Sequence, residues 1–101
     1  MSLPAIDTNH FTKFLVDLLN IASPTGFADP AIAFVEKELS QYQQLELSRT
    51  RKGALVAMWK VDNDLPPVAL TAHVDTLGAV VKEIKSNGRL KLSRIGGLQW
   101  P

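Results

Sequence analysis

Two stretches near the start of the chain show the hydrophobic period of an α-helix. In residues 11–19, apolar side chains recur at i, i+3, i+4, i+7 and i+8, which is the pattern of one helical face. These positions are Phe11, Phe14, Leu15, Leu18 and Leu19. The sequence therefore predicts a first helix, with its N-cap among residues 7–9 and its end near Ile21, before the turn-forming residues 23–26.

A second helix is predicted to begin at Asp29 and Pro30. Asp29 can supply the N-cap oxygen, and Pro30 suits the first helical position, where its missing N–H costs nothing. An apolar stripe at helical spacing follows, and we expect it to pack in the core, not to hold a cofactor. Its members are Ile32, Val35, Leu39 and Tyr42.

From Leu45 onward the hydrophobic period changes to two, which is typical of strands. Residues 45–48 alternate and predict a half-exposed strand, and a turn at Lys52-Gly53 leads to a longer apolar strand over 54–61. Residues 68–73 are mostly small or apolar and predict a third, buried strand.

A β-hairpin is predicted near the end of the chain. Asn87-Gly88 is the strongest hairpin signal in the sequence, and it joins predicted strands over 79–84 and 89–95. Two helices, three strands and a hairpin indicate an α/β protein. A buried strand needs a covering layer on both faces, and two helices offer limited cover. We therefore expect the opening part of a larger α/β fold, or a chain that assembles with another.

Composition and charge exclude several classes of protein. Eleven basic and ten acidic residues leave a net charge of +1, and the longest basic cluster, residues 49–52, lacks interleaved aromatics, so we expect neither nucleic-acid nor membrane binding. The absence of cysteine excludes disulfides, thiolate zinc sites and a cysteine nucleophile. No secretory signal and no apolar run of about 18 residues is present, so we expect a cytoplasmic location.

The candidate chemistry lies in His73-Val74-Asp75, at the end of the predicted strand 68–73. In α/β sheets, ligands bind outside the carboxyl ends of the strands. Residues two apart on an extended chain point to the same side, so Asp75 can accept one ring N–H of His73 and make the other nitrogen a better metal ligand. The alternative is a structural histidine that is paired with a nearby carboxylate. The residues alone leave both interpretations open.

The motif and its flanks resemble a known family. The stretches that carry the resemblance are Ser23-Pro24-Thr25-Gly26-Phe27, Thr71 to Gly78, Val80-Val81-Lys82, the Asn87-Gly88 turn and Ile95-Gly96-Gly97. In this order they resemble the tetrahedral aminopeptidases, also called glutamyl or deblocking aminopeptidases, which are metallopeptidases with a co-catalytic metal pair. Thr76 departs from the acidic residue that is more usual at its position.

The resemblance implies a fold and a division into domains. Residues 1–78 would be the N-terminal portion of a three-layer α/β/α catalytic domain. Residues 79–101 would be the first hairpin of an inserted β-rich dimerisation domain, cut short at Pro101. For the full-length enzyme, a homo-oligomer is implied in which dimers build to a dodecamer.

The resemblance also implies a reaction and a role for each motif residue. His73 would be a terminal ligand to one of two divalent metal ions, zinc or cobalt, and Asp75 would orient its imidazole. The reaction would be hydrolysis of the N-terminal residue from peptide substrates, with a metal-bridging hydroxide as nucleophile and a glutamate as general base. The other ligands and that glutamate would lie beyond Pro101. The chain alone is therefore expected to bind zinc weakly and to lack peptidase activity.

Two other functions remain as alternatives. One is a non-catalytic α/β interaction module, in which the hairpin pairs with a partner and the His-x-Asp motif is structural. The other is a glycan-degrading enzyme, because members of the family have carried endoglucanase labels. Nothing in the sequence supports the second alternative, since no paired carboxylates beside an aromatic sugar platform can be identified.

Overall fold

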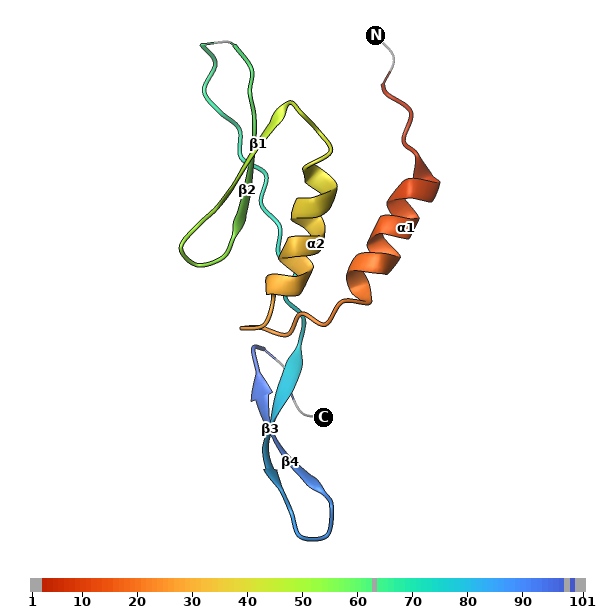
Figure 1. Ribbon diagram of the computed structural model, residues 1–101, viewed down its shortest axis with the longest axis vertical. Coiled ribbons are helices and arrows are strands. Elements are labelled where there is room, and N and C mark those ends of the chain that lie inside the picture. The colour runs from red at the N-terminus through yellow and green to blue at the C-terminus, as the bar shows by residue number, and fades with distance from the viewer. Residues whose placement is uncertain (1–2, 63, 98, 100–101) are drawn as a thin grey trace.

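The computed structural model describes residues 3–62, 64–97 and 99 of the chain. Figure 1 shows the helices and β-hairpins of the chain arranged along one long axis. The elements in chain order are α1 (Thr8–Leu19), α2 (Asp29–Leu39), β1 (Leu45–Arg49), β2 (Leu55–Trp59), β3 (Gly78–Ile84) and β4 (Leu90–Ile95). Within the described residues, no helix is both long enough and apolar enough to cross a membrane.

The first helix forms where the hydrophobic period predicts it. The Asp7 side chain accepts a hydrogen bond from the His10 backbone N–H at 3.0 Å, which caps the helix as expected for an aspartate in this position. Only part of the predicted apolar face is covered, because Phe14 and Leu18 are half-buried whereas Phe11 and Leu19 remain exposed.

The second helix also forms, but its predicted cap is wrong. The N-cap residue is Ala28, and Asp29 is already inside the first turn, followed by Pro30. A carboxylate in the first helical turn is still favourable, because it faces the positive end of the helix dipole. The ring of Phe34 stacks on Phe14 with the ring centroids 5.3 Å apart, which joins α2 to α1.

The two hairpins confirm the predictions from strand period and turn residues. Strands β1 and β2 pair antiparallel, as do β3 and β4. In the second hairpin Gly88 has a φ of 79°, a value that glycine adopts without the strain of a side chain, and the Asn87 side chain accepts a hydrogen bond from the Arg89 N–H. A β-bulge lies between Val81 and Glu83.

The predicted buried strand over residues 68–73 is wrong for this structure. These residues are not part of any strand, and all six are exposed. A strand requires a neighbour for its backbone hydrogen bonds. Strands β1 and β2 pair with each other in one two-stranded sheet, and β3 and β4 do so in another. Each strand keeps one free edge, but residues 68–73 pair with none of them.

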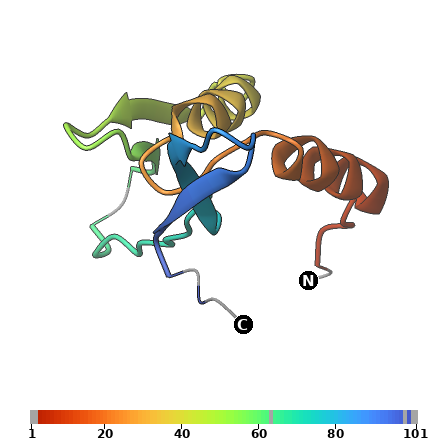
Figure 2. The same ribbon diagram turned by 90° about the horizontal axis from the view of Figure 1, so that it is seen from below.

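The chain has little hydrophobic core. In the described part of the chain, Ala31 is the only fully buried apolar residue. The radius of gyration is 18.7 Å, whereas a compact domain of this length has about 13 Å. Figures 1 and 2 both show α2 between α1 and the β1–β2 hairpin, and Figure 1 shows the β3–β4 hairpin extending away from them. The mixed helix and strand content agrees with the expected α/β class, but the described residues form no three-layer arrangement.

Candidate functional site

The site lies where the turn after α1 meets the segment that leads into β3. The Ser23 hydroxyl donates a hydrogen bond to the Val74 carbonyl at 2.7 Å, and the Thr76 N–H donates to the Ser23 carbonyl at 2.8 Å. Pro24 and Thr76 form an isolated parallel bridge. Ser23 is buried, with 4% of its surface exposed. These bonds hold residues about 50 positions apart in the sequence against each other.

Two glycines allow the chain segments to approach this closely. A Cβ added at Gly78 would lie 2.7 Å from Pro24 Cβ, which is far inside van der Waals contact. A Cβ added at Gly96, whose φ is 67°, would lie 2.9 Å from the Thr25 hydroxyl oxygen. The turn containing Pro24 and Thr25 therefore packs against the first residue of β3 and the residue that follows β4, at the end of the hairpin nearest the His-x-Asp motif.

His73 and Asp75 interact as the extended spacing predicts. His73 Nδ1 and Asp75 Oδ1 are 2.8 Å apart, and Asp75 Oδ2 accepts a hydrogen bond from the Thr25 hydroxyl, also at 2.8 Å. The hydrogen bond from Thr25, and then the one from His73, lower the pKa of Asp75 below its ordinary value. Asp75 is therefore held as a carboxylate with both oxygens engaged.

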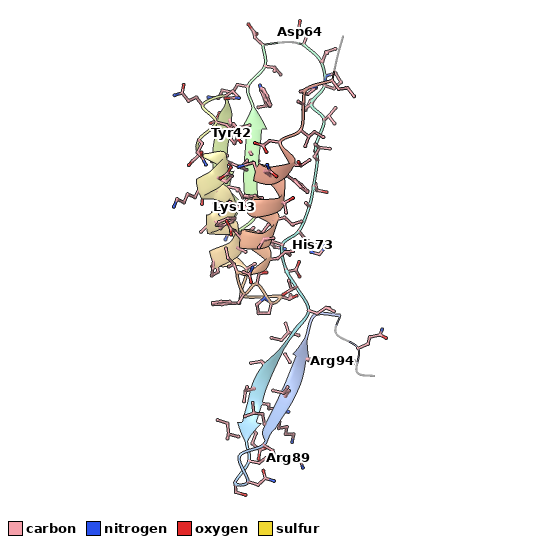
Figure 3. The ribbon with its side chains drawn as sticks, turned by 90° about the vertical axis from the view of Figure 1, so that its right-hand side faces the viewer. Lys13, Tyr42, Asp64, His73, Arg89 and Arg94 are labelled. Atoms are coloured by element: carbon pink, nitrogen blue, oxygen red, sulfur yellow. The ribbon has the colours of Figure 1, made fainter. Side chains whose placement is uncertain are left out.

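The remaining nitrogen of His73 faces outward. A carboxylate can only accept hydrogen bonds, so the bond to Asp75 requires the proton of a neutral imidazole to be on Nδ1. Nε2 then carries a lone pair, and the His73 side chain is 82% exposed. In Figure 3, His73 lies at the end of the extended trace, just before the β3–β4 hairpin. In this arrangement Nε2 of His73 can donate its electron pair to an acceptor that approaches from the solvent.

Among the described residues, His73 and Asp75 have no companions that would complete a metal site. No group of three or more His, Cys, Asp or Glu side chains suited to a metal ion occurs in this part of the chain, whereas a zinc site normally takes at least three protein ligands. The chemistry of His73 with Asp75 therefore fits at most one ligand position with its orienting carboxylate, and the described residues offer no further ligands beside it.

Sequence reasoning missed the contributions of Ser23 and Thr25. The stretch Ser23-Pro24-Thr25-Gly26 was expected only as a turn and as part of the family resemblance. The available signal was a pair of hydroxyl residues flanking a proline, since hydroxyl side chains in turns commonly form local hydrogen bonds. Their actual partners, Val74 and Asp75, could not be inferred because they lie far away in the sequence.

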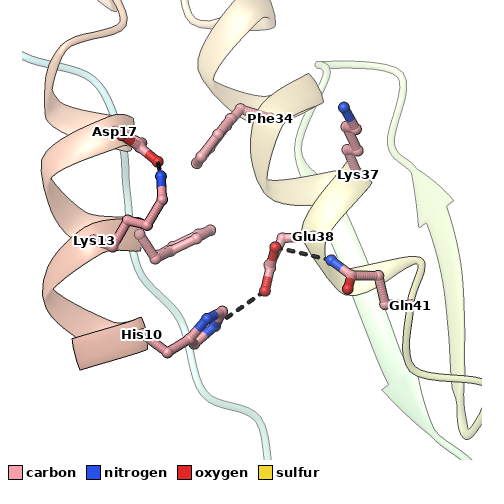
Figure 4. A pocket seen from close by; sticks show the side chains of 8 residues that line it. His10, Lys13, Asp17, Phe34, Lys37, Glu38 and Gln41 are labelled. Carbon is pink, nitrogen blue, oxygen red and sulfur yellow. Dashed lines mark hydrogen bonds and ion pairs between the residues drawn. The ribbon is translucent and has the colours of Figure 1, made fainter. Parts of the chain in front are cut away.

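The second histidine belongs to a separate groove between α1 and α2. This groove has a volume of about 260 Å³ and is shown in Figure 4. His10 Nε2 lies 3.1 Å from Glu38 Oε1, so this histidine pairs with a carboxylate of α2. Lys13 pairs with Asp17 along α1, and Glu38 also accepts a hydrogen bond from Gln41. Most of the charged groups in the groove are thus already paired.

Comparison with known proteins identifies relatives of the chain. Residues 53–101 match the family model described as M42 glutamyl aminopeptidase. Over 88 residues the chain is 42% identical to "Putative aminopeptidase YhfE" of Bacillus subtilis (strain 168). The alignment covers 87% of the chain and 25% of the relative, so the chain spans about a quarter of the length of that relative.

The two matches support each other. The family model includes His73, Asp75 and the whole β3–β4 hairpin. The identity of 42% extends over most of the chain and therefore beyond the residues that the family model matches. The family resemblance inferred from the motifs is thus confirmed: residues 53–101 match the M42 glutamyl aminopeptidase family, and the alignment to the relative extends over most of the chain.

Proposed function

We propose that the chain carries part of the active site of a metal-dependent aminopeptidase. In this proposal His73 is a terminal ligand, through Nε2, to one of two divalent metal ions, zinc or cobalt. The observation that carries the proposal is the series of hydrogen bonds from Thr25 to Asp75 to His73, which leaves Nε2 outward-facing. The match of residues 53–101 to a peptidase family adds independent support.

Asp75 acts in this proposal as a positioning residue and not as a metal ligand. Its Oδ1 accepts the Nδ1–H of His73, which fixes the tautomer and the ring orientation and increases the basicity of Nε2. Its Oδ2 is held by Thr25, so the carboxylate cannot rotate freely. When bound, the divalent metal ions would supply Lewis acidity and an activated water for hydrolysis of the first peptide bond of a peptide substrate.

The wider organisation of the enzyme follows from the same proposal. Residues 1–78 would contribute to a three-layer catalytic domain, and residues 79–101 would begin an inserted dimerisation domain. The β3–β4 hairpin extends away from the helices, which agrees with a role in a separate unit. Assembly of dimers into a dodecamer, and a cytoplasmic location, are the remaining parts of the proposal.

A paramagnetic metal titration tests the role of His73. Because Nε2 of His73 is outward-facing whereas Nε2 of His10 is paired with Glu38, we expect added Co²⁺ to broaden the ring signals of His73 before those of His10. The matched His10→Ala variant should keep the broadening of the His73 signals, and in His73→Ala the His10 signals should stay as sharp as in the unchanged chain. Equal broadening of both histidines, or loss of the His73 broadening in His10→Ala, would contradict the assignment.

A further inference from the structure

The turn of the β3–β4 hairpin contains an asparagine that is followed by a glycine. Asn87-Gly88 is the only such pair in the sequence, since the other three asparagines precede histidine, isoleucine and aspartate. Both residues of the pair are exposed, and nothing lies within 4 Å of a Cβ built on Gly88. In Figure 3, Arg89 lies at this turn, at the end of the hairpin away from the helices. The side-chain amide of Asn87 and the backbone nitrogen of Gly88 are therefore accessible to water.

The side chain of Asn87 is held over the peptide bond that follows it. Its Oδ1 accepts a hydrogen bond from the Arg89 N–H at 3.1 Å. This bond closes an Asx turn, in which the side chain binds the backbone two residues further on. The ring of atoms closed by the bond contains both Cγ of Asn87 and the backbone nitrogen of Gly88, and the N–H contact draws electrons from the carbonyl at Cγ. An electrophilic carbon and a backbone nitrogen thus belong to one short ring.

The Gly88 nitrogen is bonded, but local opening of the turn releases it. Its N–H donates to the Lys85 carbonyl at 2.9 Å, and the Lys85 N–H donates to the Arg89 carbonyl, also at 2.9 Å. These bonds close a sheet of only two strands. A hairpin of two strands is marginally stable in water, and exposed turns open locally at little cost in free energy. The nitrogen is therefore available to attack the neighbouring side chain.

We propose that Asn87 is a site of spontaneous modification, in which its amide is converted to a carboxylate through a succinimide. The Gly88 nitrogen attacks Cγ and forms an N–Cγ bond, the Cγ–Nδ2 bond breaks, and the proton of the Gly88 nitrogen passes through water to the departing ammonia. One water molecule then opens the ring. Its attack at Cγ gives an aspartate with the original backbone, whereas its attack at the backbone carbonyl gives an isoaspartate, whose main chain runs through the side chain. The proposal does not depend on the metal role of His73.

The product differs from the original hairpin in charge and in shape. The new carboxylate lies in the turn between Lys85 and Arg89, and it cancels the formal net charge of +1 of the chain. A net charge near zero promotes association between protein molecules. An isoaspartate also lengthens the main chain by one methylene carbon. The bonds that join Gly88 to Lys85 and Lys85 to Arg89 then lose their register, so the modification weakens the end of the hairpin.

Asn20 provides an internal control, because it is placed less favourably for the same reaction. The residue after it is Ile21, whose β-branched side chain crowds the nitrogen that would have to attack. That nitrogen donates its N–H to the Leu18 carbonyl at 3.1 Å, and the Asn20 side-chain amide donates to the Val16 carbonyl at 2.8 Å. We therefore expect Asn20 to keep its amide while Asn87 loses its own.

Ageing of the 101-residue chain in mildly alkaline H₂¹⁸O tests this inference. The chain is digested in ordinary water, so that the label marks only modification that preceded digestion, and the peptides are analysed by mass spectrometry with fragmentation that distinguishes isoaspartate from aspartate. We expect loss of the Asn87 amide, incorporation of ¹⁸O at this residue and isoaspartate among the products. The amide of Asn20 should be retained in the same samples.

Two variants test the ring closure itself. Asn87→Gln keeps the amide but adds a methylene group, so the five-membered ring cannot form and the amide should persist. Gly88→Asn places a side chain beside the attacking nitrogen and should slow the loss of the Asn87 amide, while asparagine still tolerates the φ of 79° at this position. The proposal is overturned if Asn87 keeps its amide as long as Asn20, if aspartate forms without isoaspartate, or if Asn87→Gln loses its amide as fast as the unchanged chain.

Discussion

At the scale of single residues, the two oxygens of Asp75 have different partners. Oδ1 is bonded to the imidazole of His73, and Oδ2 is bonded to the hydroxyl of Thr25, which comes from the turn after α1. A residue distant in sequence thus lowers the pKa of Asp75 and holds the orientation of its carboxylate next to His73. Thr25 is the less obvious member of this set, because a threonine in a turn has no chemical signature of its own.

Replacing Thr25 by valine should raise the pKa of Asp75 in the metal-free chain. The Thr25 hydrogen bond is the largest cause of the lowered pKa, and valine keeps the shape without the donor. Since the folded-state pKa is lowered, the contribution of this carboxylate to stability is present above its ordinary pKa and is lost as the pH falls through the lowered pKa. In Thr25→Val that loss should occur at a higher pH.

The pKa of Asp75 can be followed by the ¹³C shift of its carboxyl carbon during a pH titration. Thr50→Val is a suitable control, since its hydroxyl bonds the Ala54 N–H and lies on another turn. An unchanged titration of Asp75 in Thr25→Val would show that the Thr25 bond does not form in solution.

Substitution of Gly78 by alanine should loosen the contact between the turn and the hairpin. The added Cβ would meet Pro24 Cβ at 2.7 Å, and overpacking of this kind costs about 1–3 kcal/mol. We expect faster hydrogen exchange of the Thr76 N–H, which donates to Ser23. Gly97→Ala is the matched control, because nothing lies within 4 Å of a Cβ built there. Equal exchange rates in the two variants would contradict the close packing.

At the scale of elements, the helices depend on each other. An isolated helix of 12 residues is marginal in water, and the few connections of α1 to α2 include the Phe14–Phe34 stack and the His10–Glu38 pair. The exposed ion pair contributes little by itself. The aromatic stack is therefore the main reason for α1 to hold its place beside α2.

Replacing Phe34 by alanine should reduce the helix content of α1. The stack contributes about 0.5–1.5 kcal/mol beyond its buried area, which is large for a marginal helix. The secondary chemical shifts of residues 8–19 report the change. Phe27→Ala removes an exposed ring outside both helices and should leave these shifts unaltered. If α1 keeps its full helix content in Phe34→Ala, the stack is not what holds it.

At the scale of the whole molecule, the chain exposes much of the surface that a domain would bury. The radius of gyration of 18.7 Å and the near absence of fully buried apolar residues in the described part have the same origin. The helices and hairpins are formed, but they do not close around a common core.

The purified 101-residue chain is expected to have no aminopeptidase activity. With one histidine ligand, it should bind zinc weakly, and the described residues offer no group of three metal ligands. Hydrolysis of leucine and glutamate p-nitroanilides measures the activity, with and without added zinc or cobalt. Chelator-sensitive turnover that is lost in His73→Ala would contradict this expectation.

The local elements could be predicted from the sequence to a large extent. Three local patterns correctly predicted their elements. These are the helical period of 3.6 at residues 11–19, the period of two at 45–48 and the Asn87-Gly88 turn. The pairing of His73 with Asp75 follows from spacing as well, since residues two apart on an extended chain share a side. In each case the deciding interactions connect residues close together in the sequence.

The features that only the tertiary structure decided depend on contacts between residues far apart in the sequence. The docking of Ser23 and Thr25 on residues 74–76, and the close packing that Gly78 and Gly96 permit, cannot be inferred from local pattern. The segment 68–73 shows the converse. Its apolar sequence specifies a strand suited to burial, but a strand forms only when a neighbour satisfies its backbone, and no described strand pairs with it. Sequence alone thus determined the capacity of this segment to pair, and the tertiary structure decided that it is unpaired in this chain.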